Sequence, residues 1–220
     1  MANPLIWISF VASLLYYVTQ PWHPFPGSIA LKGLSVAPLA IMAWRSALPK
    51  RDGLFLGLAL AFGSLGDVLL EWSADLFAAG LGAFLIGHIV YISLFWRNRP
   101  KPTRMGILDG GIVILLGLFV TFMSMWLLPS TGSLAPAVAM YMGALTGMVV
   151  AAVALQLPER WVMLGALLFL ISDTILAVSK FKSPVVGRDL LVWPTYYVGQ
   201  LLIAVGYLRS KAGSAKEGGR

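Results

Sequence analysis

The sequence contains no cysteine among its 220 residues, so disulfide bonds and thiolate chemistry are excluded. Charged residues are scarce as well: they make up 11% of the chain, whereas soluble domains carry about 25%. Histidine occurs only at His23 and His88, too few for the ligand set of a zinc hydrolase. The sequence also lacks a Gly-x-Ser-x-Gly elbow and a phosphate-cradling glycine loop. We therefore expect neither a metal ion nor a cofactor.

Apolar residues dominate the chain instead. Hydrophobic residues account for 59% of the sequence, and the mean hydropathy is +0.84. They form continuous runs rather than alternating with polar residues, which favours membrane-spanning helices over a β-barrel. Because one helical span takes about 20 apolar residues, the length accommodates about nine or ten spans at most and no soluble domain. We interpret the chain as an integral membrane protein.

Prolines and charged residues divide the apolar sequence into about eight segments, for example at residues 97–102. The expected transmembrane helices cover about residues 4–19, 27–46, 53–71, 75–96, 105–127, 133–156, 160–180 and 188–209. The first lacks a basic leader and a clear cleavage site, so we interpret it as a span and not as a signal peptide. The predicted fold class is all-α, a polytopic membrane helical bundle of about eight transmembrane helices. It forms one domain, residues 1–209, followed by a disordered basic tail at 210–220.

The distribution of lysine and arginine predicts the orientation of this bundle. With eight spans, both termini share one side, and that side carries twelve of the sixteen basic residues: Arg45, Lys50, Arg51, Arg97, Arg99, Lys101, Arg104, Arg160, Arg209, Lys211, Lys216 and Arg220. The other side carries Lys32, Lys180, Lys182 and Arg188, and the last three are the main exceptions. We expect a protein of a bacterial inner (plasma) membrane, with both termini in the cytoplasm.

Two aspartates interrupt the apolar segments. Asp67 lies in residues 63–71 (GSLGDVLLE), and Asp173 lies in residues 169–176 (FLISDTIL). A charge near the bilayer centre costs about 2.5–3.5 kcal/mol, so such residues usually face a cavity and serve a function. The alternative is that both only hydrogen-bond to neighbouring helices. In one shared cavity, one aspartate can stay protonated as a proton donor while the other stays ionised, which makes them a candidate acid–base pair.

The two halves of the chain resemble each other weakly. The two aspartates have similar neighbours, and residues 87–89 (GHI) resemble residues 199–201 (GQL), four spans further on. After an even number of spans the chain crosses the membrane in the same direction again, so a repeat of four spans would be a parallel 4+4 internal repeat about an axis along the membrane normal. The repeat predicts that both aspartates lie at a similar depth, about 20 Å from the cytoplasmic side of a core of about 30 Å.

Other polar residues are expected at or close to this layer, with His88 and Gln200 one or two helical turns nearer the cytoplasm. Lys32, just inside the second span, is either a snorkelling lysine or a cation that holds a phosphate or tunes an aspartate. Glu71 lies one turn beyond Asp67, and we interpret it mainly as an interfacial charge. His88 is surrounded by apolar residues, where a structural hydrogen bond and a catalytic role are equally open.

Three further candidates flank the predicted site. Tyr196 and Gln200 are neighbours at positions i and i+4 of the last span, although Tyr196 also fits an aromatic belt at the membrane surface. Ser172 directly precedes Asp173. We expect these residues to support or bind the substrate rather than to react with it.

Together, these stretches resemble the YhhN-like lysoplasmalogenase family. The resemblance rests on residues 63–70 (GSLGDVLL), 80–91 (GLGAFLIGHIVY), 165–173 (GALLFLISD) and 195–203 (TYYVGQLLI), and it covers nearly the whole chain in order. The chain departs from the family at Lys32-Gly33, where Lys-Pro is typical, which leaves the local backbone shape open. The resemblance implies eight spans and hydrolysis of the vinyl ether bond of lysoplasmalogens to a fatty aldehyde and a glycerophospho-alcohol. It also implies that Asp67 and Asp173 are the catalytic residues.

This chemistry suits two carboxylates without a metal or cofactor, because it resembles the oxocarbenium chemistry of glycosidases. We expect a lysophospholipid substrate and membrane lipids as partners, and no nucleic acid. The alternative is a small proton-coupled transporter that uses the same aspartates. A structural lipid-binding protein without turnover is a third reading. A transporter needs pathways to both aqueous sides, whereas an enzyme needs one closed pocket that opens to lipid.

Overall fold

Eight α-helices, joined by loops and short 3₁₀ turns, make up the residues that this computed structural model describes, 3–103 and 105–217. They are α1 (Pro4–Thr19), α2 (Ser28–Trp44), α3 (Lys50–Trp72), α4 (Phe77–Asn98), α5 (Ile107–Leu127), α6 (Ala135–Leu155), α7 (Trp161–Phe181) and α8 (Arg188–Glu217). No strand occurs among the described residues. The predicted all-α class is confirmed, while the internal repeat stays a prediction.

Seven of these helices are long and apolar enough to cross a membrane within the described part of the chain. The exception is α2, whose 17 residues extend about 25 Å at 1.5 Å per residue. The predicted span at about 27–46 agrees with this helix to one residue at its start and two residues at its end. Gly27 has a left-handed conformation (φ 102°), so the helix begins only at Ser28, and Ser46 donates a hydrogen bond to the carbonyl of Ala43 at the other end.

The last helix differs from its predicted boundary in the opposite direction. α8 continues to Glu217, beyond the predicted end at residue 209, and so enters the segment interpreted as a tail. This segment contains alanine, lysine and glutamate, which are good helix formers. Arg104 and Arg220, which contribute to the charge count above, lie outside the described residues.

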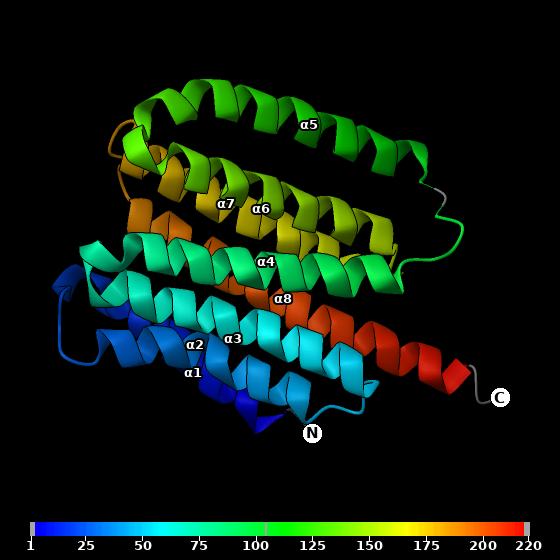
Figure 1. The fold of residues 1–220 in the computed structure, drawn as a ribbon. Coiled ribbons are helices and arrows are strands. Elements are labelled where there is room, and N and C mark those ends of the chain that lie inside the picture. Colours follow the sequence, from blue (N-terminus) through cyan, green and yellow to red (C-terminus); the bar gives the residue numbers. More distant parts are fainter. Residues whose placement is uncertain (1–2, 104, 218–220) are drawn as a thin grey trace.

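The helices run roughly alongside one another (Figure 1). Successive helices from α1 to α4 pack together, and α6 packs on α4. α8 packs against α7 and also contacts α2. α5 lies at the edge of the bundle, against α6 (Figure 1). α1 begins and α8 ends toward the same end of the bundle (Figure 1). We call the opposite end, which carries the α3–α4 and α7–α8 connections, the mouth end.

Close backbone contacts hold α7 and α8 together. A Cβ atom on Gly165 would lie 2.6 Å from the carbonyl oxygen of Gly199, and one on Gly199 would lie 2.8 Å from that of Gly165. Any larger side chain would force the helices apart. This contact fixes α8, and with it Tyr196, against the helix that carries Asp173.

A glycine face on α3 does the same for Asp67. A Cβ atom on Gly63 would lie 2.7 Å from the amide nitrogen of Gln200, and one on Gly66 would lie 2.6 Å from the ring of Phe84. The absence of side chains at these two positions lets α8 approach α3 one turn before Asp67 and lets α4 approach it directly beside Asp67. The glycines therefore position the neighbours of the carboxylate.

Candidate active site

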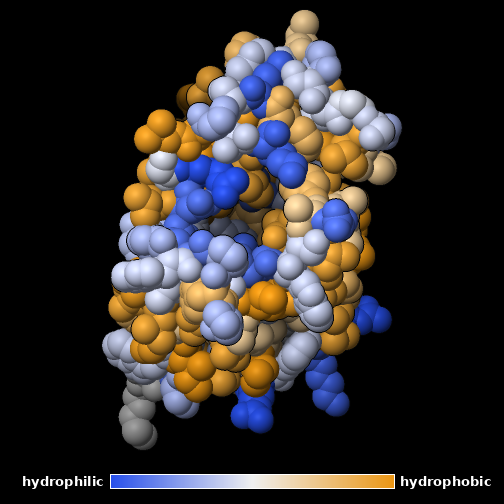
Figure 2. Space-filling view, turned by 90° about the vertical axis from the view of Figure 1, so that its left-hand side faces the viewer, coloured by the Kyte–Doolittle hydropathy of each residue, from blue (hydrophilic) through white to orange (hydrophobic). Residues whose placement is uncertain are grey.

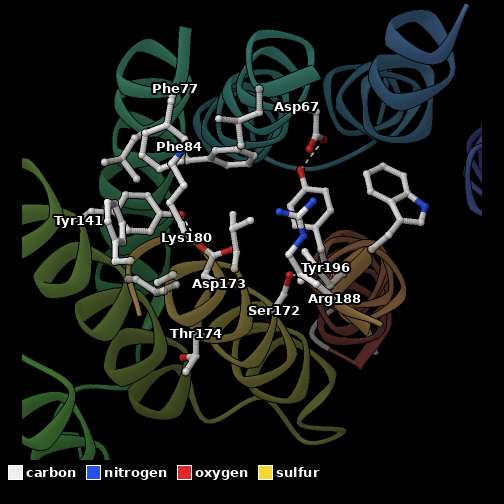
Figure 3. Close-up of a pocket in the computed structure, with 18 of the residues that line it drawn as sticks. Asp67, Phe77, Phe84, Tyr141, Ser172, Asp173, Thr174, Lys180, Arg188 and Tyr196 are labelled. Atoms are coloured by element: carbon white, nitrogen blue, oxygen red, sulfur yellow. Dashed lines mark hydrogen bonds between the residues drawn. The ribbon is translucent and has the colours of Figure 1, made fainter. Parts of the chain in front are cut away.

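A cavity of about 460 Å³ opens into the bundle from the mouth end, and both Asp67 and Asp173 line it. Figure 2 looks at this end and shows a hollow whose rim is largely hydrophilic. Figure 3 shows the two aspartates entering the cavity from different helices, with Tyr196 on one side and Tyr141 on the other. The structure thus brings together two carboxylates that are 106 positions apart in the sequence.

Asp67 is almost completely buried, with 3% of its surface exposed. The hydroxyl of Tyr196 donates a hydrogen bond of 2.6 Å to its Oδ2 atom. The side chain of Gln200 in turn donates to the Tyr196 hydroxyl at 3.4 Å and accepts a 2.8 Å bond from the hydroxyl of Tyr91. This chain of neutral donors fixes the orientation of the Asp67 carboxylate.

Asp173 has a similar partner from another helix. The hydroxyl of Tyr141, on α6, donates a hydrogen bond to its Oδ2 atom. The preceding residue, Ser172, donates instead to the backbone carbonyl of Val192 at 3.0 Å. Ser172 therefore joins α7 to α8 beside the cavity, and its hydroxyl is committed to the backbone.

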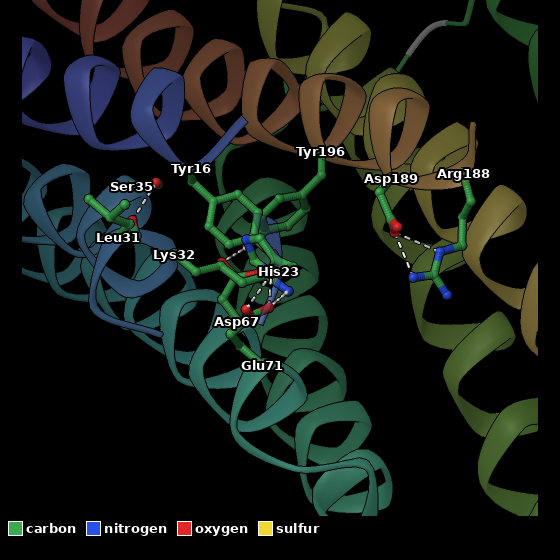
Figure 4. A network of polar contacts seen from close by, with 10 residues as sticks. All are labelled: Tyr16, His23, Leu31, Lys32, Ser35, Asp67, Glu71, Arg188, Asp189 and Tyr196. Atoms are coloured by element: carbon green, nitrogen blue, oxygen red, sulfur yellow. Dashed lines mark hydrogen bonds and ion pairs between the residues drawn. The ribbon is translucent and has the colours of Figure 1, made fainter. Parts of the chain in front are cut away.

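Lys32 and Glu71 form the centre of a polar network beside Asp67 (Figure 4). The Lys32 ammonium lies 3.3 Å from the carboxylate of Glu71. Glu71 also accepts a 2.8 Å hydrogen bond from Tyr16 and lies 3.1 Å from Nδ1 of His23. The ammonium further lies 5.5 Å from the centre of the Tyr16 ring. Glu71, interpreted above as mainly an interfacial charge, is therefore the common partner of three side chains in the cavity wall.

His88 and Gln200 lie deeper in the bundle and do not line the cavity. His88 is 1% exposed, and its ring packs against those of Tyr141 and Phe169, with centroids 5.1 and 4.9 Å apart. Neither ring nitrogen of His88 has a hydrogen-bond partner among the described residues. Both residues support the tyrosines that hold the aspartates, Gln200 by a hydrogen bond and His88 by packing. They do not reach the space where a substrate would bind.

The cavity divides into a polar and an apolar part. The polar part contains the Lys32–Glu71 network, Trp193 and Tyr196. The apolar part extends between α4, α5 and α6 and is lined by Leu81, Phe119, Val120, Met123, Leu127, Val138, Met142 and Leu145. The two aspartates lie where these parts meet (Figure 3). The cavity thus suits a molecule with a polar head, a long apolar chain and a reactive bond between them.

Sequence reasoning missed several residues of this cavity. Tyr141 was not singled out, although it is a phenol inside an apolar helix, where a buried hydroxyl needs a partner. His23 was considered only as one of two histidines, too few for a zinc site, but its ring lies 3.1 Å from Glu71 in the cavity wall. Lys180 and Arg188 were noted only as exceptions to the charge count, and both line the mouth. Their position on the side with few basic residues was the feature of the sequence that could have identified them.

The site contains few metal-binding groups. Among the residues that the structure describes, no three His, Cys, Asp or Glu side chains are grouped closely enough to hold a metal ion. Four carboxyl groups line the cavity: Asp67 and Asp173, each held by a tyrosine hydroxyl, Glu71, which pairs with Lys32, and Asp189, which pairs with Arg188.

Comparison with known proteins agrees with the resemblance noted in the sequence. Lysoplasmalogenase TMEM86A of Bos taurus is 34% identical over 173 residues, which cover 74% of this chain and 68% of the relative. The lysoplasmalogenase of Mycobacterium tuberculosis is 29% identical over 201 residues, which cover 85% and 74%. No solved structure shows significant similarity. The model of the YhhN family matches residues 27–207, so the chain belongs to the YhhN family.

Proposed function

We propose that this protein is a membrane-embedded hydrolase that cleaves the vinyl ether bond of lysoplasmalogens. The products are a fatty aldehyde and a glycerophospho-alcohol. The observation that carries the proposal is the pair Asp67 and Asp173, which face one cavity between a polar and an apolar part. Relatives named lysoplasmalogenases support the same substrate class.

The reaction needs a proton, a water molecule and a means of stabilising a cation. Protonation of the outer alkene carbon gives an oxocarbenium ion at the carbon bonded to the ether oxygen. Water adds to that carbon and loses a proton, which gives a hemiacetal. The hemiacetal then collapses to the aldehyde and the free alcohol. One carboxylic acid and one carboxylate suffice for these steps, as in glycosidases.

We assign the acid to Asp173 and the carboxylate to Asp67. Lys32 and Asp67 line the same part of the cavity, so the Lys32 ammonium is the positive charge on the Asp67 side. Asp173 is held by the neutral phenol of Tyr141. Asp173 therefore delivers the proton, while Asp67 stabilises the oxocarbenium ion and takes a proton from the attacking water. Lys32 and Glu71 set the charge beside Asp67.

The shape of the cavity supports a defined pose for the substrate. The alkenyl chain lies in the apolar part, between α4, α5 and α6, and the glycerophosphate lies toward the mouth. The vinyl ether then falls between the two aspartates. A single-chain lipid fits this arrangement because it needs only one apolar channel.

The interior beyond the aspartates favours an enzyme over a proton-coupled transporter. Towards the other end of the bundle, His88, Tyr91, Phe95 and Gln200 fill the space, and each is at most 1% exposed. A transporter needs an alternative opening on that side. The cavity instead has its mouth at one end (Figure 2).

The membrane placement completes the proposal. The distribution of basic residues predicts that both termini lie in the cytoplasm. We place the single transmembrane domain in the inner membrane of a bacterial cell. The mouth, at the end opposite the termini (Figure 1), then opens at the outer face of that membrane. Lysophospholipid in the outer leaflet would reach it directly.

The test is a set of three matched lipids offered to the purified protein. One carries a vinyl ether, one an ester and one a saturated ether, with the same headgroup and chain length. We expect aldehyde only from the vinyl ether, because an ester needs a nucleophile at a carbonyl and a saturated ether has no alkene to protonate. Turnover of the ester at a comparable rate, or no aldehyde from any lysoplasmalogen, would refute the proposal.

A further inference from the structure

We propose that Lys180 and Arg188, and not Lys32, bind the phosphate of the lipid headgroup at the mouth of the cavity. This proposal rests on the proposed function in taking a lysophospholipid as the ligand. It adds a binding site for one chemical group, a phosphodiester, at residues that lie away from the two carboxylates.

The pairing of charges around the cavity singles out Lys180. Lys32 is engaged by Glu71 at 3.3 Å, and Arg188 is engaged by Asp189 at 2.6 Å. The ammonium of Lys180 lies over the ring of Phe77, 4.7 Å from its centre, and has no carboxylate partner among the described residues. A phosphodiester supplies the negative charge that this group lacks.

Arg188 adds donors on the other side of the mouth (Figure 3). Its Nε and one terminal nitrogen both bond to the same oxygen of Asp189, at 2.7 and 2.6 Å. A guanidinium has five N–H donors in a planar fork that matches phosphate oxygens, so the pair with Asp189 leaves donors for a second anion. Arg188 is also the first residue of α8, where the positive end of the helix dipole lies.

The spacing along α7 matches the dimensions of the substrate. Lys180 lies seven residues after Asp173, which places both on the same face of the helix, about 10 Å apart along its axis. Helical side chains lean toward the N-terminus, so the Lys180 side chain leans back toward Asp173. In a lysoplasmalogen, five bonds separate the vinyl ether oxygen from phosphorus, about 6–7 Å when extended at standard bond lengths. The phosphate oxygens then reach the mouth when the alkene lies at Asp173.

The same site accounts for the exception in the charge distribution. Lys180, Lys182 and Arg188 place positive charge on the side of the membrane that otherwise carries little. Two of the three line the cavity, whereas Lys182 does not and lies over the ring of Trp126 at 5.3 Å. Lys182 has the same charge at the same end of the bundle, so it is a matched control.

The test is a binding measurement with lipids that the enzyme cannot cleave. A saturated 1-O-alkyl lysophospholipid and the phosphate-free 1-O-alkylglycerol of the same chain length are titrated against purified protein by calorimetry. The variants are Lys180→Met, Lys182→Met, and Arg188→Met combined with Asp189→Asn, which leaves no unpaired carboxylate. A bond from a cation to phosphate is a charge-assisted hydrogen bond, so each cavity variant should weaken lysophospholipid binding about tenfold. Binding of the alkylglycerol should change less than twofold.

A free-anion arm separates the headgroup from phosphate in general. Soluble glycerophosphocholine should compete with the lysophospholipid for the wild-type protein, and inorganic phosphate at the same concentration should compete more weakly. Equal competition by inorganic phosphate would mean a site for free phosphate and would overturn the proposal.

Two further results would also overturn it: an equal loss in Lys182→Met, which would indicate general surface charge, and an equal loss of alkylglycerol binding. Aldehyde release by the wild-type protein is measured separately. A protein that binds the alkyl lysophospholipid through Lys180 but releases no aldehyde would retain the phosphate site and refute only the proposed reaction.

Discussion

Replacing Tyr196 by phenylalanine removes one oxygen atom from the candidate active site. The Tyr196 hydroxyl donates a 2.6 Å hydrogen bond to the buried carboxylate of Asp67, and the ring is 4% exposed. Phenylalanine fills the same space, so the helices should pack as before. The carboxylate of Asp67 loses its tyrosine donor, and the assigned role of Asp67 is to stabilise a cation and to accept a proton.

The size of the effect follows from this single bond. A hydrogen bond to a charged group contributes about 1.5–3 kcal/mol, which corresponds to about a 10- to 150-fold loss in kcat/KM. The assay is fatty aldehyde release from a lysoplasmalogen by the purified variant in detergent. Thermal unfolding of the same sample shows whether the fold is intact.

The chain offers a matched control at the other end of the bundle. The hydroxyl of Tyr207 donates a 3.0 Å hydrogen bond to the buried carboxylate of Asp52, far from the cavity. Tyr207→Phe therefore loses the same kind of bond, and we expect less than a threefold loss of activity. Equal losses in both variants would mean that activity follows stability, and the reasoning about Asp67 would be refuted.

Three other predictions concern charge, packing and orientation. Lys32→Met should lower kcat by about tenfold with little change in lysolipid binding, because the Lys32 ammonium is the positive charge beside Asp67. Weaker lysolipid binding with an unchanged kcat would instead show that Lys32 binds the phosphate of the substrate. Gly165→Ala should lower the unfolding free energy by about 1–3 kcal/mol, since its Cβ atom would lie 2.6 Å from a backbone oxygen. Gly143→Ala is the control, because its Cβ atom would meet no atom within 4 Å, and equal unfolding temperatures for the two variants would contradict the packing described. In the cysteine-free chain, Ser183→Cys should react with an impermeant maleimide in intact cells and Lys101→Cys should not; the reverse pattern would invert the membrane orientation.

Much of the fold could be predicted from the sequence because each helix ends at a chemical break. Seven of the eight helices agree with the predicted spans within about three residues at each end, since prolines and charged residues stop them. α2 is one of these seven, because its observed ends, Ser28 and Trp44, lie one and two residues inside the predicted span. The end of α8 was missed, because a helix can continue into a polar segment.

The site was predictable only in part. A carboxylate in an apolar helix has a free-energy cost in the bilayer that the surrounding protein must offset, which is why Asp67 and Asp173 were singled out. Their partners carry no such signal: Tyr141 looks like any aromatic residue in a membrane helix, and its contact with Asp173 depends on how α6 packs beside α7. The pairing of Lys32 with Glu71 likewise depends on the approach of α2 to α3. Such contacts follow from tertiary packing and not from local sequence.

The most direct test of the account is aldehyde release by Asp67→Asn and by Asp173→Asn. Each variant keeps the shape of the side chain and removes the group that transfers or accepts a proton. We predict that each loses at least about 100-fold in rate, the usual effect of losing an acid or a base, while both extract and elute from a sizing column in detergent as the wild-type protein does. Wild-type rates in both variants would contradict the two-carboxylate mechanism and return the aspartates to a structural role.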